Sequence, residues 1–474
     1  MDNLDVSVLR SYHQPNMKKL DEQLKKALGG FDKKIVTLDD DPTGVQTVNH
    51  ISVYTTWDEA ALAAGFAEEK SLFFVMTNSR GMTNDKTIKT HRDIAASLSR
   101  VVNATGQDYV LISRSDSTLR GHFPLETDTL RRCIEGASDQ RFDGEIIAPF
   151  FREGGRYTIG NVHYVHEGRN LVPVGQTEFA RDKSFGYKSS DLGDYVEEKT
   201  NGQYKKKDCI YIALENLRSG NIEAITAQLM RVQGFGKVIL NAIDYCDVKV
   251  FVLAYIDAVK RGKRFLFRSA AAIPKVLGGI SDQPLLDKSQ LIDPANRNGG
   301  IVVVGSHVNK TTRQLDTLRT ARASMDFIEF DQHLVLNAGG LANEVARVSA
   351  LADAAVKSGR NITIYTRRER FDLDIADKDA QLRISTHISD AVTSVIGNLT
   401  VRPNFIIAKG GITSSDVGTK ALRVKRAEVM GQVKPGIPVW MTGPESKFPQ
   451  MPYVIFPGNV GDEDTLKEIV DLLS

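Results

Sequence analysis

The sequence predicts an α/β protein made of two α/β domains, each with a mainly parallel sheet, and a ligand cleft between them. Short apolar runs alternate with amphipathic stretches along most of the chain, which is the pattern of strand–helix–strand units. Polar or glycine-rich segments follow several of these runs, as at the carboxyl ends of parallel strands that bind ligands. At 474 residues, the chain is also too long for a single core.

The bulk composition is that of an ordinary globular protein, with 41% hydrophobic and 25% charged residues. The formal net charge of +2 gives no reason to expect a nucleic-acid or membrane partner. The three cysteines, Cys133, Cys209 and Cys246, form no CxxC pair, and no apolar leader or membrane-spanning run is visible. We therefore expect a cytoplasmic protein without a disulfide framework.

The first domain is expected over residues 1–277. Leucines at i, i+4 spacing, followed by Gly29-Gly30, predict a helix over 16–28 that stops at the glycines. Further helices are predicted over 58–66 and 84–102. Apolar or alternating runs predict strands over 35–38, 51–54, 72–76, 109–112, 146–148, 210–213, 238–240 and 265–267.

The segment 150–165 is rich in glycine and aromatic residues and predicts a β-ribbon or lid over the crevice. His163 lies in it and His166 directly follows it, but no third ligand is spaced nearby, so we do not predict a metal site. The polar segment 175–209 predicts loop and helix and carries no functional signal.

A break in periodicity separates the two domains. Residues 278–300 contain paired glycines and prolines and show no regular period, which predicts a linker or hinge. The second domain is expected over 301–474, with strands over 301–304, 361–365 and 405–408 and helices over 339–357, 386–399 and 463–473.

The stretch from Leu111 to Leu125 is the most informative part of the first domain. It places Arg114, Asp116, Ser117, Thr118, Arg120 and His122 just past a predicted strand. Such groups are costly to bury unless they bind something, and arginine pairs bidentately with carboxylate or phosphate. The alternative is a capped helix start, with Ser115, Asp116 or Ser117 as the N-cap.

Two other predicted strands of this domain also end in polar residues. Asp39-Asp40-Asp41 follows one of them, and Thr77-Asn78-Ser79-Arg80 follows the other. Three adjacent carboxylates are tolerated when a cation or basic ligand neutralises them, or when they form a solvated turn. If the strands are parallel neighbours, these ends converge on one crevice.

The second domain carries three glycine turns between strand and helix. They are Gly305-Ser306, the stretch Lys409 to Ser415, and the stretch Phe456 to Asp462. Free backbone N–H groups, glycines and hydroxyls at such positions suit a phosphate. They match neither the P-loop pattern nor GxGxxG, and a plain tight turn is the alternative.

Together these motifs resemble the four-carbon acid sugar kinases, over nearly the whole chain and in the family's order. Asp40-Asp41-Pro42-Thr43-Gly44 resembles its acidic DDxTG turn, and Ser117-Thr118-Leu119-Arg120-Gly121 resembles its STLRG signature. Gly155-Arg156 resembles a central segment of that family, and the three glycine turns resemble turns of its nucleotide site. The sequence departs from the family at His307, Ile412 and Val460, where a small residue, Glu and Phe are commoner. These departures indicate an outlying branch and leave the particular acid open.

The resemblance implies a first domain that binds a sugar acid, a second that binds ATP with Mg²⁺, and closure across the hinge to exclude water. The implied reaction moves the γ-phosphoryl group to the terminal hydroxyl of a tetronate: threonate, erythronate or an oxo-tetronate. Asp116 or Asp41 would take or orient the hydroxyl proton. The substrate residues implied are Asp40, Arg80, Arg114, Ser117, Thr118, Arg120, Gly121 and Arg156. The ATP residues implied are Ser306, Gly410, Gly411, Ile412, Thr413, Gly458 and Gly461.

The expected partners are therefore a small-molecule sugar acid and ATP, and a homodimer is one expected assembly. Two other functional classes fit the sequence less well. A sensor that binds a sugar acid or nucleotide without turnover is disfavoured by the acids and arginines of the first domain. A dinucleotide-dependent oxidoreductase is disfavoured because GxGxxG is absent.

Overall fold

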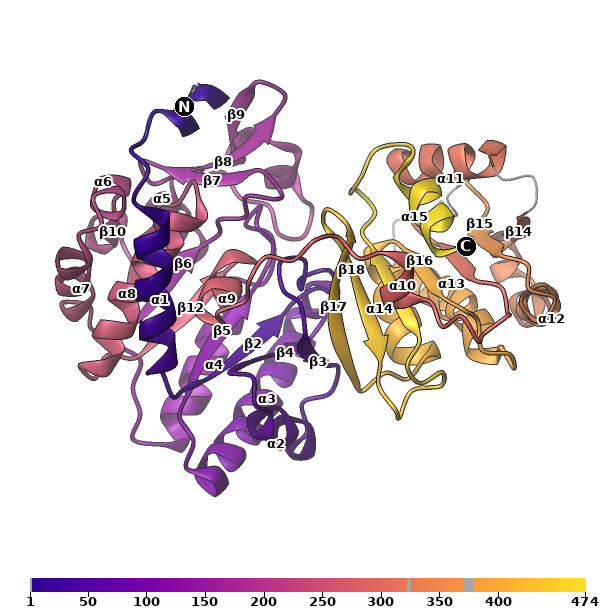
Figure 1. Cartoon of the computed structure of the whole chain (residues 1–474), viewed down its shortest axis with the longest axis horizontal. Coiled ribbons are helices and arrows are strands. Elements are labelled where there is room, and N and C mark those ends of the chain that lie inside the picture. The colour runs from indigo at the N-terminus through magenta and orange to yellow at the C-terminus, as the bar shows by residue number, and fades with distance from the viewer. Residues whose placement is uncertain (1, 322–324, 370, 372–377) are drawn as a thin grey trace. The chain divides into compact units, whose positions relative to one another are not determined.

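The fold is described from a computed structural model, which defines residues 2–321, 325–369, 371 and 378–474, with the side chains of 378–382 left aside (Figure 1). Contacts divide the chain into two compact units. The first comprises Met1–Gly44 and Thr56–Ser281, and the second comprises Val45–Thr55 and Asp282–Ser474. The chain therefore leaves the first unit at Gly44, returns at Thr56, and leaves it again after Ser281.

The first unit is built on a sheet of seven parallel strands, ordered β10-β11-β6-β12-β5-β2-β4. The strands are β2 (Lys34–Asp39), β4 (Leu72–Met76), β5 (Tyr109–Arg114), β6 (Gly144–Ala148), β10 (Ile210–Ile212), β11 (Gly236–Leu240) and β12 (Phe265–Ser269). Ile35, Phe73 and Leu266 in three of them are fully buried. A sheet covered on both faces requires such continuous apolar runs, which is why these strands could be predicted.

Helices connect and cover these strands. They are α1 (Met17–Gly29), α2 (Glu59–Ala67), α3 (Asn84–Thr105), α4 (Leu125–Ala137), α5 (Leu192–Lys199), α6 (Leu214–Arg218), α7 (Ile222–Met230), α8 (Tyr245–Lys260) and α9 (Ala272–Leu277). A separate antiparallel ribbon contains β1 (Leu4–Asp5), β7 (Arg156–Ile159), β8 (Val162–Glu167) and β9 (Asn170–Pro173). This ribbon confirms the one predicted from segment 150–165.

The second unit has a mixed sheet, ordered β3-β17-β18-β19-β16-β13-β15-β14. Its strands are β3 (Ile51–Tyr54), β13 (Ile301–Val304), β14 (Asp326–Phe330), β15 (Ile362–Thr366), β16 (Ile406–Lys409), β17 (Arg426–Lys434), β18 (Ile437–Thr442) and β19 (Pro452–Phe456). The five strands from β19 to β14 are parallel, while β3, β17 and β18 are antiparallel to their neighbours.

Strand β3 corrects the sequence analysis, which placed 51–54 in the first domain. Its residues pair with β17 across almost four hundred positions of sequence, for example Ile51 with Val429. The helices of the second unit are α10 (Lys288–Leu291), α11 (Asn309–Ala321), α12 (Gly340–Lys357), α13 (Lys378–Asn398), α14 (Gly411–Asp416) and α15 (Thr465–Leu473). The α10 turn lies inside the predicted linker.

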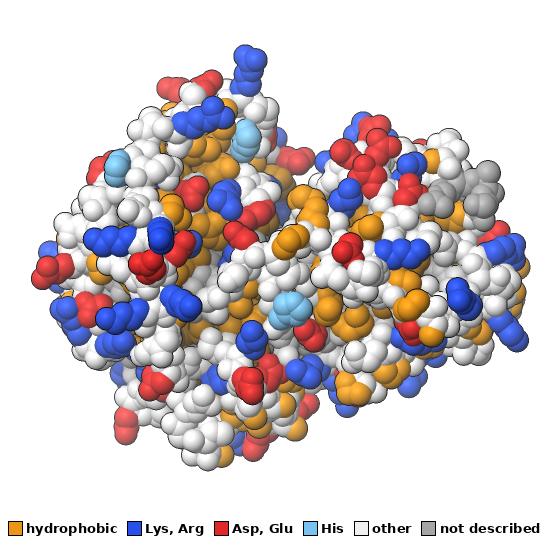
Figure 2. All heavy atoms as spheres, in the orientation of Figure 1, with side chains coloured by type: hydrophobic (Ala, Val, Ile, Leu, Met, Phe, Trp, Pro, Cys, Tyr) orange, Lys and Arg blue, Asp and Glu red, His pale blue; other side chains and the backbone are white. Residues whose placement is uncertain are grey.

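The α/β class with mainly parallel sheets is confirmed. Within the described part of the chain, no helix has the length and apolar character needed to cross a bilayer. On the face drawn in Figure 2, basic and acidic side chains are interspersed with apolar and neutral ones.

Candidate functional site

The predicted polar strand ends of the first unit do come together. Strands β4, β2, β5 and β12 are consecutive neighbours in the sheet, and Asp39 is in register with both Met76 and Arg114. Because all four strands are parallel, the residues that follow them share one edge of the sheet. The fourth strand adds Arg268, which the sequence analysis missed because nothing local distinguishes it from other strand residues.

Arg80 is the centre of the acidic cluster. Its guanidinium pairs with Asp41 and lies 3.8 Å from Asp40 and 3.7 Å from Asp116. Burial alone would raise the pKa of both Asp41 and Asp116. The charge of Arg80, together with hydrogen bonds from Thr43 to Asp41 and the charge and hydrogen bonds of the Asp116 loop, outweighs burial and holds both pKa values below their usual range. Arg80 therefore acts as the internal cation that makes three neighbouring carboxylates tolerable.

A second, fully buried layer of charge supports this cluster. Asp40 accepts a hydrogen bond from Ser115 at 2.5 Å, and Arg268 donates to Ser115 at 2.7 Å and pairs with Glu126. Burial would raise the pKa of Glu126, but Arg268, with His91 and Ser79, lowers it to about 2. Glu126 therefore stays ionised at neutral pH, and its ion pair with Arg268 holds the buried base of the site together.

Replacement of Glu126 by glutamine should destabilise the protein by about 3 kcal/mol near pH 7, because it leaves the Arg268 guanidinium buried and unpaired. The Glu126 pKa is lower in the folded state than its ordinary value of 4.5. Its contribution is therefore present above about pH 4.5 and is lost as the pH falls toward 2. Urea unfolding at pH 7, 5 and 3.5 measures this, and the gap between wild type and variant should narrow at pH 3.5.

Glu59→Gln is the matched control, since its partner Arg100 and Glu59 itself are more than half exposed. That change should cost less than about 1 kcal/mol. If the two substitutions lowered the free energy of unfolding equally, the buried ion pair of Glu126 would stabilise the protein no more than an exposed one.

The loop Ser115–Gly121 is not a helix start, so the alternative of a capped helix is wrong: the next helix, α4, begins at Leu125. Leu119 has a left-handed φ of 68° and Gly121 a φ of 123°. A Cβ on Gly121 would lie 2.7 Å from Ser115 Oγ and 2.8 Å from Arg268 Nη2. The loop can pass this close to the buried network only with glycine there.

Asp116 stands on this loop and receives hydrogen bonds from Thr118 and from Arg120 Nε, the latter at 2.7 Å. Arg120 lies over the ring of Phe179, 5.0 Å from its centroid, and Arg156 lies 5.6 Å from the same centroid. Arg156 makes no ion pair or hydrogen bond through its side chain within the described residues. Two guanidinium groups beside one ring, with one of them uncommitted, can receive an anion.

The remaining substrate candidates take different positions. Arg114 is 5% exposed and pairs with Asp39 at 3.0 Å, and burial raises the pKa of Asp39 to about 7 despite that pairing. Ser117 and Thr118 are buried in the loop. His122 is also buried and contacts Asn84 and backbone carbonyls.

The two histidines of the ribbon have separate hydrogen-bond partners. His163 Nε2 hydrogen-bonds to Ser117, whereas His166 Nε2 contacts Gly168. Among all residues that the structure describes, no group of three or more His, Cys, Asp or Glu side chains is arranged to hold a metal ion.

The three glycine turns of the second unit also converge, each following one of the neighbouring strands β13, β16 and β19. A Cβ on Gly305 would lie 2.3 Å from Thr413 Oγ1, and one on Gly410 would lie 3.1 Å from Ser306 Cβ. A Cβ on Gly458 would lie 3.2 Å from Ser306 Oγ. The glycines therefore let three backbones approach one point.

The last of these turns has an unusual hydrogen-bond pattern. Its carbonyl oxygens accept from buried or half-buried side chains: Pro457 from Lys409 at 2.7 Å, Gly458 from Thr311 at 3.2 Å, and Val460 and Asp462 from Gln314 at 3.1 and 2.6 Å. The backbone N–H groups of residues 458–461 have no partner within the described residues. Carbonyls held on one side and free N–H groups suit an anion.

A cavity of about 250 Å³ opens beside the turns. Its lining includes His307, Gln332, Thr366, Ile388, Val392 and Ile412. Ile412 is 70% exposed, which is unusual for a large apolar side chain. A mainly apolar wall with a few amide and hydroxyl groups is typical of a site for a flat, partly polar ring.

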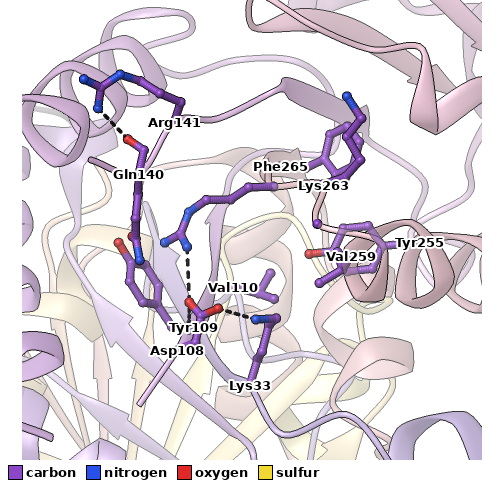
Figure 3. Close-up of a pocket in the computed structure, with 12 residues that line it drawn as sticks. Lys33, Asp108, Tyr109, Val110, Gln140, Arg141, Tyr255, Val259, Lys263 and Phe265 are labelled. Carbon is purple, nitrogen blue, oxygen red and sulfur yellow. Dashed lines mark hydrogen bonds and ion pairs between the residues drawn. The ribbon is translucent and has the colours of Figure 1, made fainter. Parts of the chain in front are cut away.

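A different pocket, of about 280 Å³, lies at the opposite end of the first unit's sheet, where β5 and β12 begin (Figure 3). Three of its cations are already paired: Lys33 with Asp108, Arg264 with Asp108 at 3.1 Å, and Lys263 with Asp143 at 2.8 Å. The fourth, Arg141, donates to backbone carbonyls. Because ligands of parallel sheets bind at the carboxyl ends of the strands, this pocket is not the candidate site.

The fold and these two sites define an α/β protein with one cluster of candidate ligand-binding groups in each unit. A family described as a sugar-binding N-terminal domain matches residues 35–277, and one described as a nucleotide-binding C-terminal domain matches residues 301–466. The first match alone covers half of the sequence, and the chain belongs to the family of four-carbon acid sugar kinases.

Two solved structures share the fold. One is a Salmonella typhimurium LT2 protein provisionally described as a tRNA synthase, with a TM-score of 0.64 and 17% identity, covering 92% of this chain and 98% of that one. The other is a Haemophilus influenzae protein of the DUF1537 family, with a TM-score of 0.59 and 16% identity over 93% and 100%. At these identities the likeness shows the fold alone. No protein of curated function matches the sequence.

Proposed function

We propose that the protein is an ATP-dependent kinase that phosphorylates the terminal hydroxyl of a four-carbon acid sugar: threonate, erythronate or an oxo-tetronate. The observation that carries this proposal is the position of the uncommitted guanidinium of Arg156 beside the same ring as Arg120, which donates a hydrogen bond to Asp116 in the sugar-binding unit. We also propose that the sugar-binding domain ends at residue 277 and that the nucleotide-binding domain begins at residue 301.

In the first unit, Arg120 and Arg156 bind the carboxylate of the acid, since a guanidinium forks onto two carboxylate oxygens. Arg80 and Arg114 are engaged by Asp41 and Asp39, so their role is to hold those two side chains in place. Asp116 orients the attacking hydroxyl. Its lowered pKa keeps it ionised and able to accept that hydrogen bond at any physiological pH.

In the second unit, the free N–H groups of residues 458–461, together with Ser306 and the turn at Gly410, Gly411 and Thr413, hold the phosphates of ATP. The cavity beside Ile412 receives the nucleobase. Mg²⁺ that arrives with ATP supplies charge neutralisation at the phosphates, where phosphate oxygens and waters suffice as its ligands. Residues 1–474 offer no separate metal cluster in the parts that the structure describes.

The test is ADP release from ATP and Mg²⁺ in the presence of a panel of four-carbon acids, their oxo forms, and the neutral tetritols erythritol and threitol. At least one acid should support turnover well above the ATPase background. The tetritols should not, because they lack the carboxylate that Arg120 and Arg156 receive. Calorimetric binding of both ATP and an acid without any ADP release would instead indicate a sensor.

A further inference from the structure

Three consecutive backbone carbonyls of the Asp116 loop accept hydrogen bonds from side chains of one later segment, residues 163–195. His163 Nε2 lies 2.8 Å from Ser117 O, Tyr187 OH donates to Thr118 O at 2.6 Å, and Tyr195 OH donates to Leu119 O at 2.9 Å. Most side-chain hydrogen bonds in proteins go to backbone groups or to water, and here three of them go to consecutive carbonyls of one loop.

These donors are themselves fixed. Thr158 Oγ1 lies 2.9 Å from His163 Nδ1, which leaves Nε2 to carry the proton that Ser117 O accepts. Burial lowers the pKa of His163 to about 4, so the ring is neutral at physiological pH. The rings of Tyr187 and Tyr195 pack edge to face with their centroids 5.5 Å apart, and Tyr195 also stacks on Phe123.

The loop needs such support. Leu119 adopts a left-handed backbone, which a residue with a branched side chain rarely does. Its side chain is buried in the same apolar cluster as Phe123, Tyr187 and Tyr195. The three carbonyls therefore point into a buried cluster, and a peptide that rotated would lose its partner inside it.

We propose that His163, Tyr187 and Tyr195 are positioning residues, which hold the carbonyls of the loop in the apolar cluster and so set the places of Asp116 and Arg120. A carbonyl released from this hold could turn toward the ligand, where its partial negative charge would repel an anion and compete for Arg120. The inference rests on the proposed function, because it gives these residues a task only if the loop binds the sugar acid.

The same segment, residues 163–195, also contacts the guanidinium groups of the site through Phe179. It supplies the ring beside both Arg120 and Arg156, and Asp182 lies 3.8 Å from Arg120. The polar segment 175–209, which carries no functional pattern in the sequence, thus places both the backbone and the cations of the site.

The experiment compares Tyr187→Phe, Tyr195→Phe and their double variant with Tyr211→Phe. Tyr211 is the matched control, because its hydroxyl donates to the carbonyl of Lys206 at 2.8 Å, outside the loop. Each loop variant should lose about fivefold to tenfold in kcat/KM for the sugar acid, as expected for one hydrogen bond, and the double variant about 50-fold. The KM for ATP should stay within about twofold.

His163 is tested with a rescue pair. His163→Gln keeps an amide that can donate to Ser117 O and should retain more activity than His163→Leu at the same thermal stability. Since Tyr→Phe keeps the ring, all tyrosine variants should stay folded, and thermal melting checks this.

This experiment distinguishes failure of the proposed function from failure of the positioning role. If the wild-type protein turns over no acid, the proposed function fails and the positioning role falls with it. If wild type is active and the Tyr187→Phe/Tyr195→Phe double variant matches Tyr211→Phe in kcat/KM, the proposed function stands and the positioning role is wrong.

Discussion

Asp116→Asn is expected to lower kcat for the sugar acid by about 10²- to 10⁴-fold, the range usual for a group that handles a reacting proton. The amide keeps the size of the side chain but loses the negative charge that orients the hydroxyl. Arg120 and Thr118, which donate to Asp116, keep an oxygen acceptor. The KM for ATP should be nearly unchanged, because the nucleotide turns lie in the other unit.

Asp41→Asn separates this role from that of the scaffold. Asp41 accepts from the backbone N–H of Thr43 at 2.8 Å and pairs with Arg80, so it holds its own turn. We expect this variant to lose thermal stability and to keep a kcat within about tenfold of wild type. Steady-state kinetics and thermal melting of both variants decide between them, and an Asp116→Asn kcat close to that of wild type would remove Asp116 from the reaction.

The pH dependence follows from the same charges. Because Arg80 and Arg120 hold the pKa of Asp116 well below its usual range, protonation of Asp116 should not limit the rate between pH 5 and 8. If the rate falls toward acidic pH within that interval, the titrating group is not Asp116. Asp39 is the candidate in this cluster, because its pKa of about 7 lies inside the interval.

Lys409→Met is expected to make the folded protein more stable at pH 7, by about 3 kcal/mol, while it weakens ATP binding. Lys409 is fully buried, and this burial lowers the pKa of its amine from 10.5 to about 6. The folded state therefore binds fewer protons than the unfolded state between about pH 6 and 10.5, and wild-type stability rises with pH by up to about 1.4 kcal/mol per unit.

The variant lacks this amine, so the difference in unfolding free energy between Lys409→Met and wild type should be largest near pH 6 and should vanish toward pH 10. Denaturant unfolding at pH 6, 7, 8 and 9.5 measures the gap. Lys420→Met is the control, because Lys420 is half exposed and pairs with Asp390, and it should change stability by less than about 1 kcal/mol. A gap that does not depend on pH would show that Lys409 is charged in the folded protein.

The loss of ATP affinity has a separate cause. Lys409 donates to Pro457 O and so helps to turn the carbonyls of the last glycine turn away from its free N–H groups. Without this bond we expect the Kd for ATP to rise about tenfold, which is measured by calorimetry. A more stable protein that binds its ligand less well is the usual outcome when a strained site is relaxed.

Local patterns alone were enough to predict the α/β class, the apolar strands of the first sheet and the polar residues at their ends. Buried parallel strands must be continuously apolar, and ligands bind at their carboxyl ends, so both features are written in short stretches such as 72–76 and 109–112. The three glycine turns could be found because glycines and hydroxyls stand directly between a predicted strand and a predicted helix. That Gly305, Gly410 and Gly458 lie against residues of another turn is visible only in the tertiary structure.

Tertiary structure decided the rest. Strand β3 reads the same whichever sheet it joins, and only its pairing with β17 places it in the second unit. The roles of Glu126, Arg268, Phe179, Tyr187 and Tyr195 depend on contacts with residues far away in sequence. A side chain's identity shows what it can donate or accept, but which carbonyl or charge it meets is set by the packing of distant elements, and no local spacing records that.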